Sequence, residues 1–199
     1  MHTSGKSVEF LFDFGSPTTY LAFHVLRRIA ERHDAEIRWT PVLLGGIFQL
    51  SGNVSPALHP AKGRWMMQDL QRWADQWDVP FRPRFPPAST LALARGAVAA
   101  LEQPHFLPYC EAVFDALWRD GEDLAIERNL KALLERIGWP PPDFHAAITS
   151  PAIKAALHEN TRNAVARGVF GAPTFFVGNE MHFGQDRMMF VEKALLSVH

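Results

Sequence analysis

The chain has 199 residues, a formal net charge of −1 and a single cysteine. One cysteine excludes an internal disulfide, a Cys-x-x-Cys redox pair and a cysteine-based zinc cluster, and the near-zero charge gives no field for binding nucleic acid or an anionic membrane. No apolar run is long enough to span a membrane, and the polar N-terminus carries no secretory signal, so we expect a cytoplasmic protein. A chain of this length forms one domain, or one domain with an insertion.

The first forty residues have the pattern of a strand, a helix and a second strand. The β-rich run from Val8 to Phe14 predicts a strand, which Gly15-Ser16-Pro17 ends. Serine suits the N-cap of a helix and proline suits its first turn, and apolar residues at helical spacing then predict a helix to about His33. The run from Ile37 to Pro41 predicts another strand. This order is typical of a βαβ unit.

The middle of the chain has a different pattern. A region rich in glycine and polar residues predicts a long loop around the short apolar piece from Ile47 to Leu50. Apolar residues at helical spacing then predict several helices, separated in part by proline-rich pieces at 79–87 and 139–142. Near the end, Thr174 to Val177 and Met181 to Phe183 predict a hairpin, followed by a helix from Gln185 to Val198. The order predicts an α/β domain interrupted by a helical insertion.

Three short segments offer sites for an anionic or peptide-like ligand. Ser16 is either a helix cap alone or a hydroxyl donor beside a helix N-terminus, where free N–H groups favour an anion such as a thiolate. Pro173 either opens an edge strand or forms a cis peptide bond that leaves the backbone of Ala172 free to pair with an extended ligand. Asp186 and Gln185 either cap the last helix or bind the ammonium and carboxylate groups of an amino-acid head group.

We expect structural roles for the other reactive side chains. The nine histidines show no metal-binding spacing, so the sequence predicts no metal site. Cys110 lies on the apolar face of a predicted helix and is expected to be buried and unreactive. Trp65, Trp73 and Trp77 are candidates to line a pocket for an aromatic substrate, although the spacing of the last two favours the core.

Four segments together resemble the 2-hydroxychromene-2-carboxylate isomerase family, which is related to the kappa-class glutathione transferases and the DsbA-like thiol oxidoreductases. They are VEFLFDFGSPTTYLA (Val8 to Ala22), SGNVSPALHPAKG (Ser51 to Gly63), DLQRWA (Asp69 to Ala74) and GVFGAPTFFVGNEMHFGQDR (Gly168 to Arg187). The resemblance spans nearly the whole chain. It implies a homodimer with a thioredoxin-like domain, residues 1–45 and 166–199, interrupted by an all-helical insertion domain, residues 46–165.

The resemblance also implies glutathione as the cofactor and assigns a set of site residues. Ser16 falls where the oxidoreductases carry the first cysteine of their Cys-x-x-Cys motif, and Thr19 falls where they carry the second. Ser16 would then be the catalytic residue, hydrogen-bonded to the glutathione sulfur. Relatives often have an aromatic residue where this chain has Thr18, and asparagine or serine where it has Gln185. The residues that would bind glutathione or shape its loop are Asn53, Lys62, Ala172, Pro173, Gln185 and Asp186.

The implied activity is the cis/trans isomerisation of 2-hydroxychromene-2-carboxylate or a similar aromatic pyruvate-type compound. It would proceed through reversible addition of the glutathione thiolate, so glutathione would not be consumed. Two alternatives stay open: a kappa-like transferase that conjugates glutathione to an electrophile, and a non-catalytic glutathione-binding protein. A disulfide oxidoreductase is the least expected, because hydroxyl residues occupy both cysteine positions. Several aromatic residues allow an aromatic substrate, namely Phe48, Trp65, Phe81 and Phe85.

Overall fold

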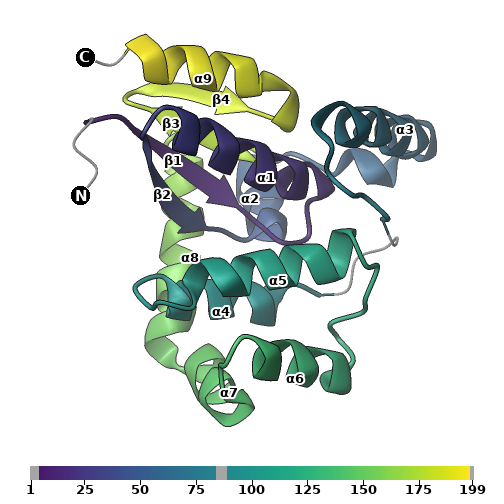
Figure 1. Ribbon diagram of the computed structural model, residues 1–199, viewed down its shortest axis with the longest axis vertical. Helices are drawn as coiled ribbons and strands as arrows, with labels where there is room; N and C mark the ends of the chain where they lie inside the picture. Colours follow the sequence, from purple (N-terminus) through teal and green to yellow (C-terminus); the bar gives the residue numbers. More distant parts are fainter. Residues whose placement is uncertain (1–4, 84–88, 198–199) are drawn as a thin grey trace.

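The computed structural model describes residues 5–83 and 89–197, and within them a single mixed sheet has the strand order β2-β1-β3-β4. Strand β1 (Ser7–Phe12) runs parallel to β2 (Glu36–Pro41). Strand β3 (Thr174–Val177) is antiparallel both to β1 and to β4 (Glu180–Phe183). The sheet therefore joins the two ends of the chain, as Figure 1 shows by the adjacent purple and yellow-green strands.

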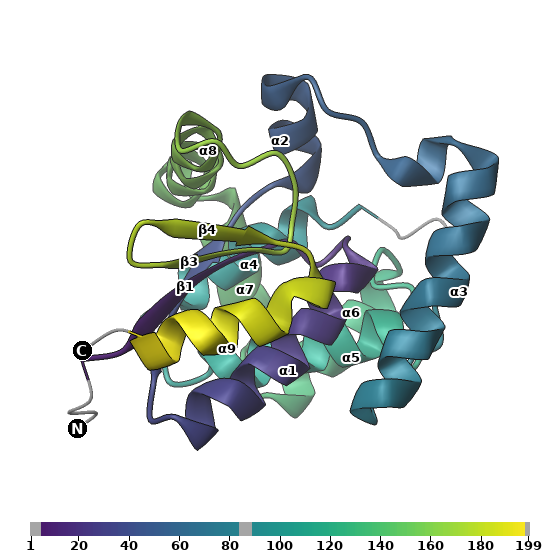
Figure 2. The same ribbon diagram turned by 90° about the horizontal axis from the view of Figure 1, so that it is seen from above.

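Alternate side chains of the strands pack on opposite faces of the sheet, as the pleat requires. Phe10 points to the face covered by α1 (Pro17–Arg32) and α9 (Met188–Ser197), which lie side by side in Figure 2. Leu11 packs in a separate cluster with residues of α2 (Leu44–Ser51) and α8 (Pro151–Ala166). Both faces of the sheet are thus buried, which explains why its inner strands are almost continuously apolar.

The remaining helices form a second body beside the sheet, except for α3 (Pro60–Trp77), which packs against α1. They are α4 (Leu91–Ala100), α5 (Phe106–Trp118), α6 (Glu127–Arg136) and α7 (Pro141–Thr149), which lie together at the bottom of Figure 1. Two short 3₁₀ helices are also present, η1 (Pro56–Leu58) and η2 (Gln185–Arg187).

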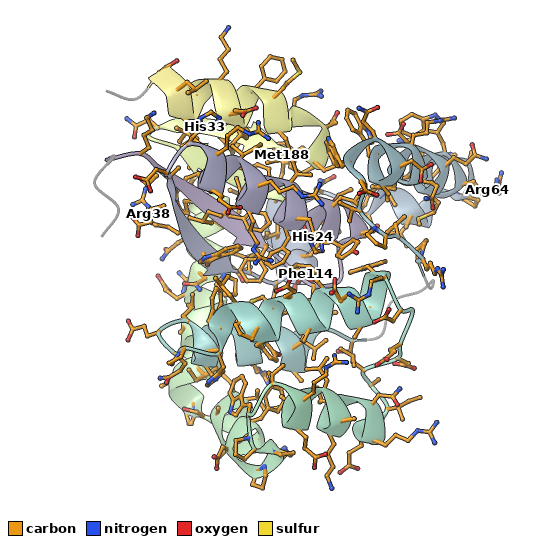
Figure 3. The ribbon with its side chains drawn as sticks, viewed as in Figure 1. His24, His33, Arg38, Arg64, Phe114 and Met188 are labelled. Carbon is orange, nitrogen blue, oxygen red and sulfur yellow. The ribbon has the colours of Figure 1, made fainter. Side chains whose placement is uncertain are left out.

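One continuous core joins this helical body to the sheet. Figure 3 shows Phe114 of α5 at the boundary with α1, where its ring lies 5.0 Å from that of Phe23. From the end of α5, the indole N–H of Trp118 donates a buried hydrogen bond of 2.8 Å to the carbonyl of Phe14. Because Phe14 lies two residues before Ser16, the helical body directly braces the end of β1.

The structure confirms the α/β domain interrupted by helices. The first predicted strand ends at Phe12, and the last predicted helix begins at Met188, after η2. Two larger differences concern whole helices. Residues Leu44–Ser51 form helix α2 rather than a loop: Gly46 lets this helix approach α8 so closely that a Cβ would lie 3.0 Å from the Thr161 methyl group. Helix α7 was not predicted, because its two leading prolines resemble a break, although proline is well tolerated in a first helical turn.

Some predictions fall outside the described residues or remain untested. Val198, the predicted end of the last helix, and positions 84–87 of the proline-rich piece lie outside the described residues. The domain boundaries at 45/46 and 165/166 stay predictions. None of the helices in the described part of the chain is both long and apolar enough to cross a membrane.

Candidate functional site at the Ser16 junction

Ser16 is placed by the tight connection between β1 and α1. Its backbone is extended, and its hydroxyl oxygen accepts a hydrogen bond of 3.2 Å from the Thr19 N–H, so it caps α1 as predicted. Pro17 occupies the first helical position, where a missing N–H costs nothing. Ser16 is 3% exposed, so its hydroxyl is held in place by its surroundings rather than free in solvent.

The loop that precedes β3 lies against this junction. The Ala172–Pro173 peptide bond is cis, as one of the two alternatives for Pro173 predicted, while the pairing of Ala172 with a ligand stays a prediction. The Ser16 hydroxyl donates a buried hydrogen bond of 3.1 Å to the Ala172 carbonyl, across 156 residues of sequence. That carbonyl is therefore already an acceptor, whereas no described residue accepts a hydrogen bond from the Ala172 N–H. Of the Ala172 backbone groups, the N–H is the one left for an extended ligand.

A second hydroxyl joins Ser16, and it belongs to Thr18. The two hydroxyl oxygens are 2.6 Å apart, and the Thr18 hydroxyl also lies 3.3 Å from the Ala172 carbonyl. Thr19, at the position of the second motif cysteine, instead has a fully buried hydroxyl with no hydrogen-bond partner in the described part of the chain. The resemblance assigned Thr19 only the second cysteine position, and Thr18, which was not among the predicted site residues, supplies the hydroxyl that contacts Ser16.

These groups form one end of a cavity of about 330 Å³, near the lower end of the roughly 300–1,000 Å³ of small-molecule sites. Its polar end contains Ser16, Thr18 and Ala172. The rest of the wall is largely apolar, and the described residues that line it carry no charge. The larger apolar side chains come from three different parts of the chain, namely Leu44, Phe48, Met66 and Phe183.

The buried carboxylate of Asp13 holds the backbone of Gly15, which lines the cavity next to Ser16. Asp13 is 3% exposed and accepts hydrogen bonds from the Gly15 N–H at 2.6 Å, the Leu44 N–H at 2.9 Å and the Thr90 hydroxyl at 3.3 Å. Burial raises the pKa of Asp13 above its usual range, while these three donors act in the opposite direction. Asp13 thereby links the starts of α1, α2 and α4, and the sequence pattern had not singled it out.

Asn53 lines the cavity, but its side chain is used within the protein. Its amide group donates a hydrogen bond of 2.8 Å to the Phe170 carbonyl, and its side-chain oxygen accepts one from the Val54 N–H. The loop after α2 is thus fastened to the loop that leads to the cis proline. In this arrangement Asn53 shapes the mouth of the cavity.

The structure places the other predicted binding residues away from the lining. Lys62 is exposed in the first turn of α3. Gln185 is buried in η2, directly after Gly184, whose N–H donates to the Pro173 carbonyl at 3.0 Å. Asp186 borders a different cavity of about 390 Å³ between α1, α3 and α9, and its carboxylate pairs with Arg187.

Of the aromatic residues proposed to line a substrate pocket, some line the Ser16 cavity and others do not. Phe48 lines the Ser16 cavity, Phe81 is buried in the core, and Trp65 is 60% exposed. Trp73 and Trp77 pack against the core, as predicted, and border the second cavity. Phe85 lies outside the described residues.

Two further expectations concern metal ligands and the thiol. In residues 5–83 and 89–197 no three histidine, cysteine or acidic side chains are grouped closely enough to hold a metal ion. Cys110 is fully buried, and burial raises the pKa of its thiol well above the usual range, so the prediction of an unreactive core cysteine is supported.

Comparison with known proteins places this architecture in a family. Residues 7–196 match the DSBA-like thioredoxin domain. The chain is 34% identical to the 2-hydroxychromene-2-carboxylate isomerase of Pseudomonas sp. (strain C18), over 94% of this chain and 89% of that one. It is 29% identical to the kappa 1 glutathione S-transferase of Homo sapiens, over 92% and 88% of the two chains.

Solved structures agree with these matches. A structure of 2-hydroxychromene-2-carboxylate isomerase superposes with a TM-score of 0.86 and 32% identity, covering 95% of this chain and 94% of that one. A probable DsbA oxidoreductase from Streptomyces coelicolor, 16% identical, shares the fold with a TM-score of 0.72, covering 98% and 92% of the two chains. The interrupted α/β domain is therefore thioredoxin-like, and the chain belongs to the 2-hydroxychromene-2-carboxylate isomerase family of DSBA-like thioredoxin domains.

Proposed function

We propose that this protein is a glutathione-dependent isomerase that acts on 2-hydroxychromene-2-carboxylate or a similar aromatic pyruvate-type compound. The observation that carries the proposal is the Ser16 hydroxyl, held at a helix N-terminus and at the polar end of a cavity. The likeness to isomerases over most of the chain supports the reaction type.

The residues of the cavity fit a thiol-bearing peptide. The Ala172 N–H is left to pair with an extended backbone, and the hydroxyls of Ser16 and Thr18 lie beside it. The cysteine thiol of glutathione has a reference pKa near 8.5 in solution, so it is largely protonated at neutral pH. A hydroxyl donor and the partial positive charge of the α1 N-terminus both favour the anion, and the described residues that line the cavity include no carboxylate to repel it. When bound, glutathione supplies a thiolate that adds reversibly to a conjugated alkene and is then released unchanged.

The apolar wall supports an aromatic second substrate. Phe48 and Phe183 offer ring surfaces at the cavity, and Met66 adds an adaptable thioether side chain. In this proposal Ser16 holds the negative charge of the sulfur, and α2 and β4 supply the surfaces that orient the aromatic ring.

The test is conversion of 2-hydroxychromene-2-carboxylate, followed by ultraviolet absorbance, with and without glutathione. We expect turnover only with glutathione and no loss of total thiol. Thiol consumed in proportion to an added electrophile would instead identify a kappa-like transferase, and binding of glutathione without turnover of either compound would identify a binding protein.

The matched variants are Ser16→Ala and Ser150→Ala. Both remove a serine that precedes a helix, but Ser150 lies before α8, outside the cavity lining. We expect Ser16→Ala to lower kcat on the order of 100-fold, the usual effect of losing one preorganised donor to a developing negative charge. Ser150→Ala should keep its activity. Circular dichroism of both variants reports whether the fold is intact, and full activity of folded Ser16→Ala would refute the role of Ser16.

A further inference from the structure

We propose that Thr18 is a positioning residue that makes the Ser16 hydroxyl a dedicated donor to the glutathione sulfur. The inference rests on the proposed function and concerns how its central residue is controlled. It starts from three oxygens: the hydroxyls of Ser16 and Thr18, 2.6 Å apart, and the Ala172 carbonyl, 3.1 Å and 3.3 Å from them.

The protons of this cluster can be counted. Each hydroxyl has one proton to donate, and the Ala172 carbonyl has none. If Ser16 donates to Ala172, the short contact between the hydroxyls requires Thr18 to donate to Ser16. If Thr18 donates to Ala172, then Ser16 donates to Thr18. The same three oxygens therefore support two arrangements, and in both of them every proton is used.

Binding of an anion at Ser16 requires a third arrangement of the protons. When the Ser16 proton turns to the sulfur, the Ala172 carbonyl, which belongs to a buried residue, loses one donor. The Thr18 hydroxyl is already within 3.3 Å of that carbonyl and takes its place. Thr18 thus lets Ser16 turn to the ligand without leaving a buried carbonyl unpaired, which is the costly outcome.

This exchange also sets the direction of the bond between Ser16 and the ligand. The Ser16 oxygen already accepts from the Thr19 N–H at 3.2 Å, and with Thr18 donating to Ala172 the Ser16 proton is left for the ligand. That proton favours a thiolate, which needs a donor, over the S–H of a thiol, which needs an acceptor. Thr18 is therefore expected to lower the pKa of bound glutathione through Ser16.

The burial of the two residues agrees with Ser16 as the donor to the sulfur and Thr18 as the residue that positions it. Ser16 is 3% exposed, whereas Thr18 is half-buried and lines the cavity beside it. Thr19 cannot substitute, because its hydroxyl is fully buried and has no hydrogen-bond partner in the described part of the chain.

The experiment measures the thiol pKa of bound glutathione from the ultraviolet absorbance of the thiolate, with affinity measured by isothermal titration. Thr18→Val removes the hydroxyl while keeping the shape of the side chain, and Thr18→Ser keeps the hydroxyl. Thr149→Val is the matched control, because it also removes a threonine that donates to backbone carbonyls, at the end of α7.

We expect Thr18→Val to raise the pKa of bound glutathione by about one unit, the size expected for losing one neutral hydrogen bond. Thr18→Ser and Thr149→Val should keep the wild-type value. In a Ser16→Ala background, Thr18→Val should add no further shift, because it acts through Ser16.

The other outcomes separate the two proposals. A wild-type pKa in folded Thr18→Val, or a further shift in the Ser16→Ala background, would overturn the role of Thr18 and leave the proposed function standing. Wild-type protein that binds no glutathione would remove both.

Discussion

The side-chain amide of Asn53 donates a hydrogen bond of 2.8 Å to the carbonyl of Phe170, joining residues that are 117 positions apart in the sequence. This bond holds the loop after α2 against the loop that leads into the cis Ala172–Pro173 bond. Because Asn53 lines the cavity, we expect the shape of the cavity to depend on this exposed amide group.

Asn53→Asp should weaken glutathione binding while leaving stability nearly unchanged. Aspartate still offers an oxygen to the Val54 N–H, but it cannot donate to the Phe170 carbonyl. Because the bond is exposed, we expect a change of no more than about 1 kcal/mol in the free energy of unfolding, and about a tenfold rise in the Kd for glutathione.

Asn160→Asp provides the comparison for this prediction. Asn160 also donates from its amide to a backbone carbonyl, that of Pro41, but it does not line the cavity. Its substitution should leave the Kd unchanged. Equal effects of the two substitutions would show that the Asn53–Phe170 bond has no specific role at the mouth.

Gly171→Ala should disturb the cavity through Phe183. A Cβ at position 171 would lie 2.7 Å from the Phe183 ring, closer than atoms can approach, so the ring must move. Phe183 is 39% exposed and has room to move, so the melting temperature should change little. Because Gly171 and Phe183 both line the cavity, we expect the Kd for glutathione to rise about tenfold.

A second substitution tests the cause of that effect. Phe183→Leu removes the clashing ring edge, so Gly171→Ala combined with Phe183→Leu should bind glutathione more tightly than Gly171→Ala alone. If the double variant binds no better, displacement of the ring is not what weakens binding.

Asp13→Asn should destabilise the fold. The Asp13 carboxylate accepts from two backbone N–H groups, whereas asparagine offers one oxygen and one NH₂ group, so one buried N–H loses its acceptor. We expect a loss of about 1–3 kcal/mol in the free energy of unfolding, measured by urea denaturation.

The pH dependence of that loss has a definite sign. Because burial raises the pKa of Asp13, the folded state binds more protons than the unfolded state between about pH 3.9 and the folded pKa. The wild-type protein therefore loses stability as pH rises through this window, and Asp13→Asn does not. The advantage of wild type over the variant should be largest at the acid end, and a larger advantage at neutral pH would contradict the raised pKa.

Cys110 should not react with a thiol reagent in the folded protein. It is fully buried, and burial raises the pKa of its thiol well above the usual range, so almost no thiolate is present or accessible. We expect one reactive thiol per chain after unfolding in guanidinium and none before. Cys110→Ala should bind glutathione as wild type does. Rapid labelling of the native protein, or loss of binding in that variant, would give Cys110 a role that its position does not suggest.

Local patterns were sufficient for much of the fold. Alternating and continuous apolar runs identified the strands, and the Gly15-Ser16-Pro17 junction predicted the start of α1, because caps and first turns depend on neighbouring residues. The same patterns missed α2, where glycine is favoured by contact with α8, and α7, whose prolines are tolerated only at its start.

For the candidate site, local sequence patterns were enough to identify the residue types: a serine able to favour a thiolate, a proline able to turn a loop, and a single cysteine unsuited to disulfide chemistry. The homodimer and the cytoplasmic location stay predictions from sequence. Tertiary packing was needed to show that the Thr18 hydroxyl, and not the Thr19 hydroxyl, contacts the Ser16 hydroxyl, and that Asp13 links three helix starts. These relationships join groups whose directions depend on packing between distant segments, and residue spacing along the chain does not encode such directions.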